Sequence, residues 1–243
     1  CTEMKLQGCL LSLDHTLMEA QREAWPAIDV VDALLQSEYE FREQKKIETR
    51  INASKLKRKA SIEDIDYSAK RNLQKSQLKD LFRLEWVQAG RPLIMTGPTG
   101  IGKTFLAEAL GLHACRQNQT TLFISMSTFL ESLALARSTS GYLKWRDKLA
   151  KPQLLIMDDF GLKKLTTSEA HDFSEILKER GTEKSTLITT QLPLNLWKEV
   201  IPDSVIADTI IDRLIHTAIK LALTGESYRK VQAQQLDSKK GAS

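Results

Sequence analysis

One stretch of eight residues, beginning at Gly97, constrains the fold of this chain more than any other. The stretch follows the pattern Gly-x-x-x-x-Gly-Lys-Ser/Thr and consists of Gly97, Pro98, Thr99, Gly100, Ile101, Gly102, Lys103 and Thr104. An apolar run at 92–96 precedes it, and residues 103–118 carry an apolar face at helical spacing. Glycines let backbone N–H groups wrap around phosphate oxygens, and a helix N-terminus adds partial positive charge. The context therefore predicts a strand, a phosphate-binding loop and a helix, rather than an ordinary glycine-rich turn.

A second motif follows the apolar run 154–157, which ends in two carboxylates, Asp158 and Asp159. Strands that end in acidic residues are common, but beside a phosphate-binding loop such residues are expected to take part in metal binding and hydrolysis. Lys103 is expected to reach the β- and γ-phosphates of ATP, and the Thr104 hydroxyl to ligate Mg²⁺. Asp158 is then expected to hold the same magnesium ion. Asp159 is placed to orient the attacking water as a general base.

The order of apolar runs predicts the fold class. Runs at 92–96, 121–125, 153–157 and 185–189 alternate with helical stretches. Continuous apolar strands separated by helices indicate a parallel sheet covered on both faces, which is the doubly wound α/β class. The first sixty residues differ, because their apolar residues recur at helical spacing and a helix start is expected between Pro26 and Asp29. We predict a small helical domain over 1–61 and a nucleotide-binding α/β domain over 62–243.

The sequence also indicates the cellular compartment of the protein. No apolar run approaches the roughly 18 residues that a membrane span requires, and no secretory signal pattern is evident. Three cysteines, an odd number without metal-type spacing, favour free thiols in a reducing compartment. We therefore expect a cytoplasmic protein without a membrane partner.

Basic residues gather in two segments. From Lys45 to Lys59 seven basic side chains face a single glutamate, a net charge of +6. The second segment, 127–151, lies between the second and third predicted strands. The candidate nucleic-acid contacts in these segments are Lys55, Lys57, Arg58, Lys59, Arg137, Lys144 and Arg146. Few aromatic residues accompany them, so phosphate contact is favoured over base stacking, and a solvated helix face is the alternative for the first segment.

A phosphate loop by itself names no function. The chain lacks the Leu-Ser-Gly-Gly stretch of transporter ATPases and the Asn-Lys-x-Asp motif of GTPases. Five runs resemble the IstB family of AAA+ ATPases, and the likeness extends over nearly the whole chain. These runs are 97–104, 155–161, 185–193, 211–216 and 223–229. IstB proteins are helper ATPases of insertion-sequence transposition and are relatives of the helicase loaders DnaC and DnaI.

The resemblance implies roles for matching residues. Gln191, with Thr190 beside it, resembles the polar sensor that reads the γ-phosphate. Arg213 resembles the arginine finger that completes the ATP site of a neighbouring subunit, although an arginine on a helix is ordinarily just solvated. Tyr67, in the linker 62–67, would line the adenine pocket, and hydrophobic packing alone would explain this linker equally well. Asp159 departs from the glutamate that most AAA+ proteins carry.

Arg229 is a candidate second sensor, but the lid that normally presents one is absent or truncated in this sequence. The resemblance implies a homo-oligomeric, Mg²⁺-dependent ATPase that assembles on duplex DNA without strong sequence preference and recruits a transposase. The alternatives are a replicative helicase loader and a nucleotide-gated DNA scaffold whose turnover is incidental.

Overall fold

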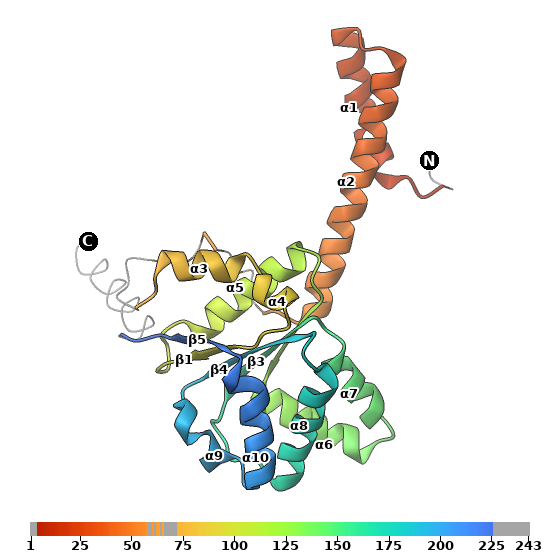
Figure 1. Ribbon diagram of the computed structural model, residues 1–243. Coiled ribbons are helices and arrows are strands. Elements are labelled where there is room, and N and C mark those ends of the chain that lie inside the picture. The colour runs from red at the N-terminus through yellow and green to blue at the C-terminus, as the bar shows by residue number, and fades with distance from the viewer. Residues whose placement is uncertain (1–3, 58–59, 61, 64, 66–71, 226–243) are drawn as a thin grey trace, which may run out of the picture. The chain divides into compact units, whose positions relative to one another are not determined.

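The computed structural model describes residues 4–57, 60, 62–63, 65 and 72–225 (Figure 1). The chain divides into two compact units, 1–52 and 53–243. The domain boundary predicted after Ser61 falls on a residue outside the described ones. It therefore stays a prediction.

The first unit is a hairpin of two helices, α1 (Gln7–Glu23) and α2 (Ala27–Ser54), and α2 continues two residues into the second unit. The prediction of helices in the N-terminal region is confirmed. A Cβ atom on Gly8 would lie only 2.6 Å from the Cα of Glu38, so the two helices approach closely at this glycine. The buried Glu38 carboxylate accepts hydrogen bonds from the N–H groups of Gly8, at 2.6 Å, and Cys9, at 3.2 Å. A negative charge at the N-terminus of α1 stabilises that helix.

The second unit is built on a five-stranded sheet. Its strands are β1 (Leu93–Thr96), β2 (Thr121–Ser125), β3 (Leu154–Phe160), β4 (Ser185–Thr190) and β5 (Ile219–Ala222). The strand order is β2-β3-β4-β1-β5, and all four pairings are parallel. The predicted parallel α/β fold is confirmed. The sequence did not predict β5, because this edge strand has four residues and exposes Lys220 in its middle.

Helices cover both faces of the sheet (Figure 1). One face carries α3 (Lys75–Phe82), α4 (Glu85–Gln88) and α5 (Lys103–Arg116). The other carries α6 (Met126–Ser138), α7 (Tyr142–Ala150), α8 (Thr167–Arg180), α9 (Trp197–Val200) and α10 (Ser204–Ile211). A 3₁₀ turn, Leu194–Leu196, precedes α9, and a π-helical turn, Asp212–His216, follows α10.

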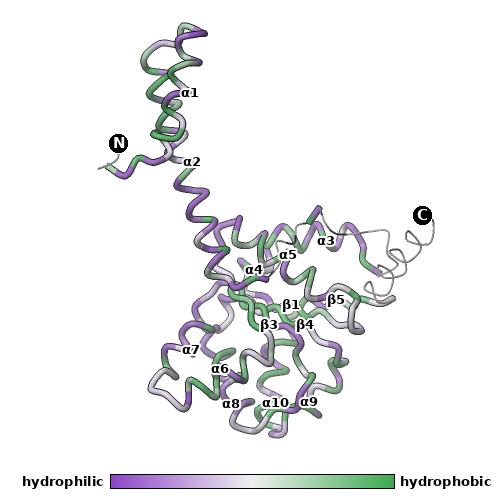
Figure 2. The backbone as a smooth tube through the Cα atoms, turned by 180° about the vertical axis from the view of Figure 1, so that it is seen from behind, coloured by the Kyte–Doolittle hydropathy of each residue, from purple (hydrophilic) through white to green (hydrophobic). Residues whose placement is uncertain are grey.

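Alternation along each strand produces two separate cores. In β3, Leu154 and Ile156 pack in the core on the side of α5, whereas Leu155 and Met157 pack in the core on the side of α8. Successive strand residues point to opposite faces, so a strand buried on both sides must be apolar throughout. Figure 2 shows the strands as a hydrophobic centre among more hydrophilic helices. Within the described residues, no helix is both long and apolar enough to cross a membrane.

Candidate nucleotide-binding site

The loop between β1 and α5 consists of the eight motif residues 97–104, called the P-loop below. Gly97 has φ 151°, Gly100 φ 79° and Gly102 φ 103°, which lie in the region that favours glycine. A Cβ atom on Gly97 would lie 2.4 Å from the carbonyl oxygen of Leu223. A side chain at this position would therefore collide with the backbone that follows β5. The glycines are required for the shape of the loop as well as for its approach to a ligand.

The Lys103 side chain closes over this loop. Its Nζ donates hydrogen bonds to the carbonyl oxygens of Gly97, at 2.7 Å, and Pro98, at 2.9 Å. Burial lowers the pKa of Lys103, while the negative charges of Asp159 and Asp158 act in the opposite direction. A triphosphate would add negative charge at this position and would stabilise the ammonium group. The residues present therefore fit a phosphate ligand.

Thr104, the last residue of the P-loop, contacts Asp158 of β3. The Thr104 hydroxyl donates to the Asp158 carboxylate, 3.0 Å from Oδ1 and 3.1 Å from Oδ2. Asp158 is only 5% exposed, and burial is the main reason that its pKa is raised, with the nearby Asp159 charge adding to the effect. Hydrogen bonds from Thr189 and Thr104 and the charge of Lys103 oppose that rise. A buried carboxylate beside a hydroxyl is a set of hard oxygen ligands that suits Mg²⁺.

Asp159 lies where β3 leaves its ladder with β4. The pairing shifts register between Met157 and Phe160, and Asp159 adopts a left-handed backbone conformation with φ 61°. Its N–H donates to Thr189 Oγ1 at 3.0 Å. Asp and Asn are enriched several-fold among non-glycine residues in this conformation, which gives a backbone reason for aspartate here.

The end of β4 carries Thr190 and Gln191, the two residues expected to sense the γ-phosphate. Thr190 is fully buried and donates to the Phe160 carbonyl at 2.7 Å, and the exposed Gln191 follows the strand. The residue of β4 that contacts Asp158 is Thr189, whose hydroxyl donates to Oδ1 at 2.5 Å. Thr189 was not among the site residues predicted from the sequence. Strand alternation from Leu187, which packs on the α5 side, would have indicated it.

Arg213 lies at the other end of the sheet. It belongs to the π-helical turn and lines a hollow with Gly90 and Thr186, which lie near the starts of β1 and β4. The P-loop, in contrast, follows the carboxyl end of β1. The structure therefore does not bring Arg213 to the P-loop of its own chain.

The basic candidates fall into two groups. Arg137 forms an ion pair with Asp172, and Arg146 lies 2.9 Å from Glu179, so both arginines tie α6 and α7 to α8. Lys55, Lys57 and Lys144 are exposed. The positive charge of Lys55 is the main reason that the pKa of Lys148 is lowered, which places two like charges close together. Arg58, Lys59, Tyr67 and Arg229 lie outside the described residues.

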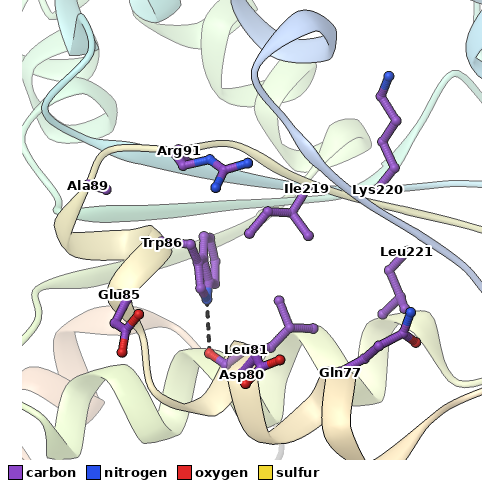
Figure 3. A pocket seen from close by; sticks show the side chains of 10 residues that line it. All are labelled: Gln77, Asp80, Leu81, Glu85, Trp86, Ala89, Arg91, Ile219, Lys220 and Leu221. Carbon is purple, nitrogen blue, oxygen red and sulfur yellow. Dashed lines mark hydrogen bonds between the residues drawn. The ribbon is translucent and has the colours of Figure 1, made fainter.

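A second hollow lies between α3, α4 and the edge strand β5 (Figure 3). Trp86, Ile219 and Leu221 are among its walls. The Trp86 indole N–H already donates to the Leu81 carbonyl at 2.9 Å. None of the described residues that line this hollow belongs to the P-loop.

The chain is similar to proteins that are named for ATP binding and to solved structures of replication proteins. The chain is 36% identical over 232 residues to a putative insertion sequence ATP-binding protein of Sinorhizobium fredii, covering 96% of this chain and 95% of that protein. The structure of DnaI has a TM-score of 0.57 at 20% identity, covering 68% of this chain and 92% of DnaI. The replication initiator DnaA, bound to AMPPCP and single-stranded DNA, has a TM-score of 0.61 at 17% identity, covering 76% of this chain and 56% of that structure. These structural likenesses show a shared fold.

The family assignment covers almost the entire chain. Residues 1–236 match the description of the IstB-like ATP binding proteins. The resemblance found in the sequence is confirmed. The chain therefore belongs to the family of IstB-like ATP binding proteins.

Proposed function

We propose that this chain is an Mg²⁺-dependent ATPase that assembles on duplex DNA and recruits a transposase. The observation that carries the proposal is the Thr104–Asp158 contact beneath the P-loop, in a chain whose relative from Sinorhizobium fredii is named an insertion sequence ATP-binding protein. An ATP site alone would fit many activities. The name of the relative favours transposition over the others.

Each residue of the site would have its own role in hydrolysis. Thr104 and Asp158 would hold Mg²⁺, which when bound neutralises phosphate charge. Lys103 would move from the carbonyl groups of Gly97 and Pro98 to the phosphates. Asp159 would accept a proton from the attacking water while the oxygen of that water bonds to the γ-phosphorus. The bond from that phosphorus to the bridging oxygen then breaks, and ADP and phosphate result.

Assembly follows from the position of Arg213. An arginine at the opposite end of the sheet from its own P-loop can complete the P-loop of a second copy. Such contacts join different surfaces of two copies and generate rings or helical filaments rather than closed pairs. A copy at the end of an assembly would therefore have an incomplete site.

We assign DNA contact to lysines rather than to the two paired arginines. Lys55 and Lys148 repel one another, and a phosphate between them would relieve that repulsion. The exposed Lys57 and Lys144 would extend the contact along the backbone of the duplex. Backbone contacts carry no sequence information, so target choice by base reading is not expected.

Two other functions would use the same site. A replicative helicase loader is supported by the likeness to DnaI, which extends over 92% of that structure. A nucleotide-gated DNA scaffold would need ATP binding but little turnover. The three differ in the protein that is recruited and in the response of hydrolysis to DNA.

A mass measurement in solution tests the proposal. The protein is measured with and without Mg²⁺ and ATP, and with and without duplex DNA, and Lys103→Ala serves as the control. We expect large assemblies only with nucleotide and DNA together, a DNA-stimulated ATPase rate, and capture of the transposase from the same insertion sequence by those assemblies. An unchanged mass contradicts the proposal. Assembly without faster hydrolysis favours the scaffold, and capture of the replicative helicase instead of the transposase favours the loader.

A further inference from the structure

The helical hairpin α1–α2 exposes an unusual amount of apolar surface. Nine of the thirteen large apolar side chains most exposed among the described residues lie in the first 39 positions. They are Met4, Leu10, Leu11, Leu17, Met18, Ile28, Val31, Leu35 and Tyr39. Scattered exposed leucines are ordinary, but such a concentration on one element marks an interaction surface.

On α2 these side chains form one row, called the α2 stripe here. Ile28, Val31, Leu35 and Tyr39 follow one another at spacings of three, four and four residues, and each is more than half exposed. This spacing places them along one side of the helix, as in the seam of helix-to-helix packing. Helical periodicity thus predicted the helix correctly, but the hairpin does not cover this side of it.

The hairpin itself is held by other residues. The buried positions of α1 are the small residues Gly8, Cys9, Thr16 and Ala20. The buried Glu38 carboxylate joins the start of α1 to α2. Because internal packing does not use the α2 stripe, its residues are available to a further helix.

The charge around the α2 stripe selects the kind of helix that fits. From Leu6 to Arg42 the chain has seven carboxylates against two arginines, a net charge of −5. Asp29, Asp32 and Glu40 lie next to stripe residues along α2. A second copy that packed its own α2 stripe against this one would bring the same acidic side chains against these, and DNA at the stripe would be repelled in the same way. A helix whose apolar face is flanked by Lys or Arg would satisfy both the apolar row and its acidic border.

We propose that the α2 stripe is a docking site for a basic amphipathic helix of a partner protein. The inference does not depend on the ATP site or on DNA binding. Docking would place the apolar face of the partner helix along Val31 and Leu35 and its basic side chains beside Asp29 and Asp32. The contact is a helix-to-helix interface with an acidic rim on this chain.

The test uses the full-length protein without nucleotide or DNA. Its probe is a fluorescein-labelled helical peptide of about 18 residues with leucines on one face and lysines elsewhere, whose binding is followed by anisotropy. A peptide with glutamates in place of the lysines is the charge control. We expect the lysine peptide to bind and the glutamate peptide not to bind. Val31→Gln with Leu35→Gln should weaken binding at least about tenfold, because the central apolar contacts carry most of such an interface.

Matched variants separate the docking site from general stickiness. Leu135→Gln removes a leucine that is 66% exposed in the other unit and should leave binding unchanged. Asp29→Asn with Asp32→Asn should weaken binding and reduce its dependence on salt. Because Val31 and Leu35 are 51% and 58% exposed, their replacement should preserve the circular dichroism spectrum. Equal binding of the two peptides, or equal binding by the stripe variant and the unchanged protein, overturns the proposal. An oligomer that dissociates in the stripe variant and does not bind the lysine peptide would assign the α2 stripe to a second copy instead.

Discussion

The hydroxyl of Thr104 lies 3.0 Å from one carboxylate oxygen of Asp158, although 54 positions separate the two residues in the chain. Thr104 belongs to the first turn of α5, and Asp158 belongs to β3. The contact joins the P-loop helix to the strand that supplies both acidic residues. This is the contact at which we propose that Mg²⁺ and ATP bind.

Replacing Asp158 with Asn should stabilise the nucleotide-free protein and remove its stabilisation by Mg²⁺ and ATP. Burial raises the pKa of Asp158, so the folded state binds this proton more tightly than the unfolded chain. The stability of the nucleotide-free protein therefore falls as the pH rises from the unfolded pKa through the folded one, and at pH 7 the ionised carboxylate carries that cost. Asn removes the cost and should raise Tm by a few degrees, since about 1 kcal/mol corresponds to roughly 2–4 °C in a chain of this size. Thermal unfolding should also show that the added stability from Mg²⁺ and ATP is lost, and a variant that keeps this stabilisation would remove Asp158 from the metal site.

Lys103→Ala should strongly weaken ATP binding. The substitution removes a charge-assisted contact with phosphate that is worth about 1.5–3 kcal/mol, or roughly 10- to 150-fold in Kd. Titration calorimetry measures the loss, and Lys103→Arg controls for charge without the same geometry. A Kd within about twofold of the unchanged protein would contradict the assignment of the P-loop.

Asp159→Asn should keep ATP binding and slow hydrolysis. Asn tolerates the left-handed backbone found at this position, with φ 61°, and so preserves the end of β3. Its amide does not accept a proton from water as a carboxylate does. Single-turnover kinetics should show trapped ATP complexes, while turnover that changes by less than about a factor of two would mean that Asp159 is not the base.

The sequence predicted the parts of this protein whose physics is local. The P-loop motif predicted the start of α5, and four apolar runs located four of the five strands. Thr189 was missed because its role depends on which face of β4 meets the P-loop, which is a property of the folded sheet. The fifth strand was missed because an edge strand needs no continuous apolar run, as Lys220 illustrates.

Long-range pairing also changed the interpretation of charged and apolar residues. Arg137 and Arg146 are basic in sequence, but ion pairs with α8 occupy them in the fold. Val31 and Leu35 follow a helical period, but that period does not say whether the chain itself covers them. Both questions concern partners distant in sequence, or outside it, and no local pattern contains that information.

Arg180 should be a main determinant of stability in the α/β unit. It is 2% exposed, and its guanidinium donates to the carbonyl groups of Leu149, at 3.1 Å, Pro152, at 2.8 Å, and Ser185. It therefore connects the end of α7 to the starts of β3 and β4. Arg180→Met leaves these buried acceptors without donors and should cost about 3–5 kcal/mol in the free energy of unfolding.

Denaturant unfolding tests this role, with Arg83→Met as the matched control. Arg83 is exposed and lies 3.6 Å from Asp80, so its loss should cost no more than about 1 kcal/mol. Equal effects of the two substitutions would show that Arg180 does not have the predicted structural role.

The central claim is that two copies of this chain share each ATP site, and mixing two inactive variants tests it most directly. Arg213→Ala should leave ATP binding by single copies nearly intact while reducing hydrolysis by about 10³-fold or more, as for arginine fingers in other P-loop enzymes. Lys103→Ala should be inactive through its own P-loop. When the two variants are mixed with DNA and shown by light scattering to assemble together, interfaces between an intact P-loop and an intact Arg213 should restore part of the ATPase rate. Co-assembly without any recovered hydrolysis would contradict the shared site and place the action of Arg213 within its own chain.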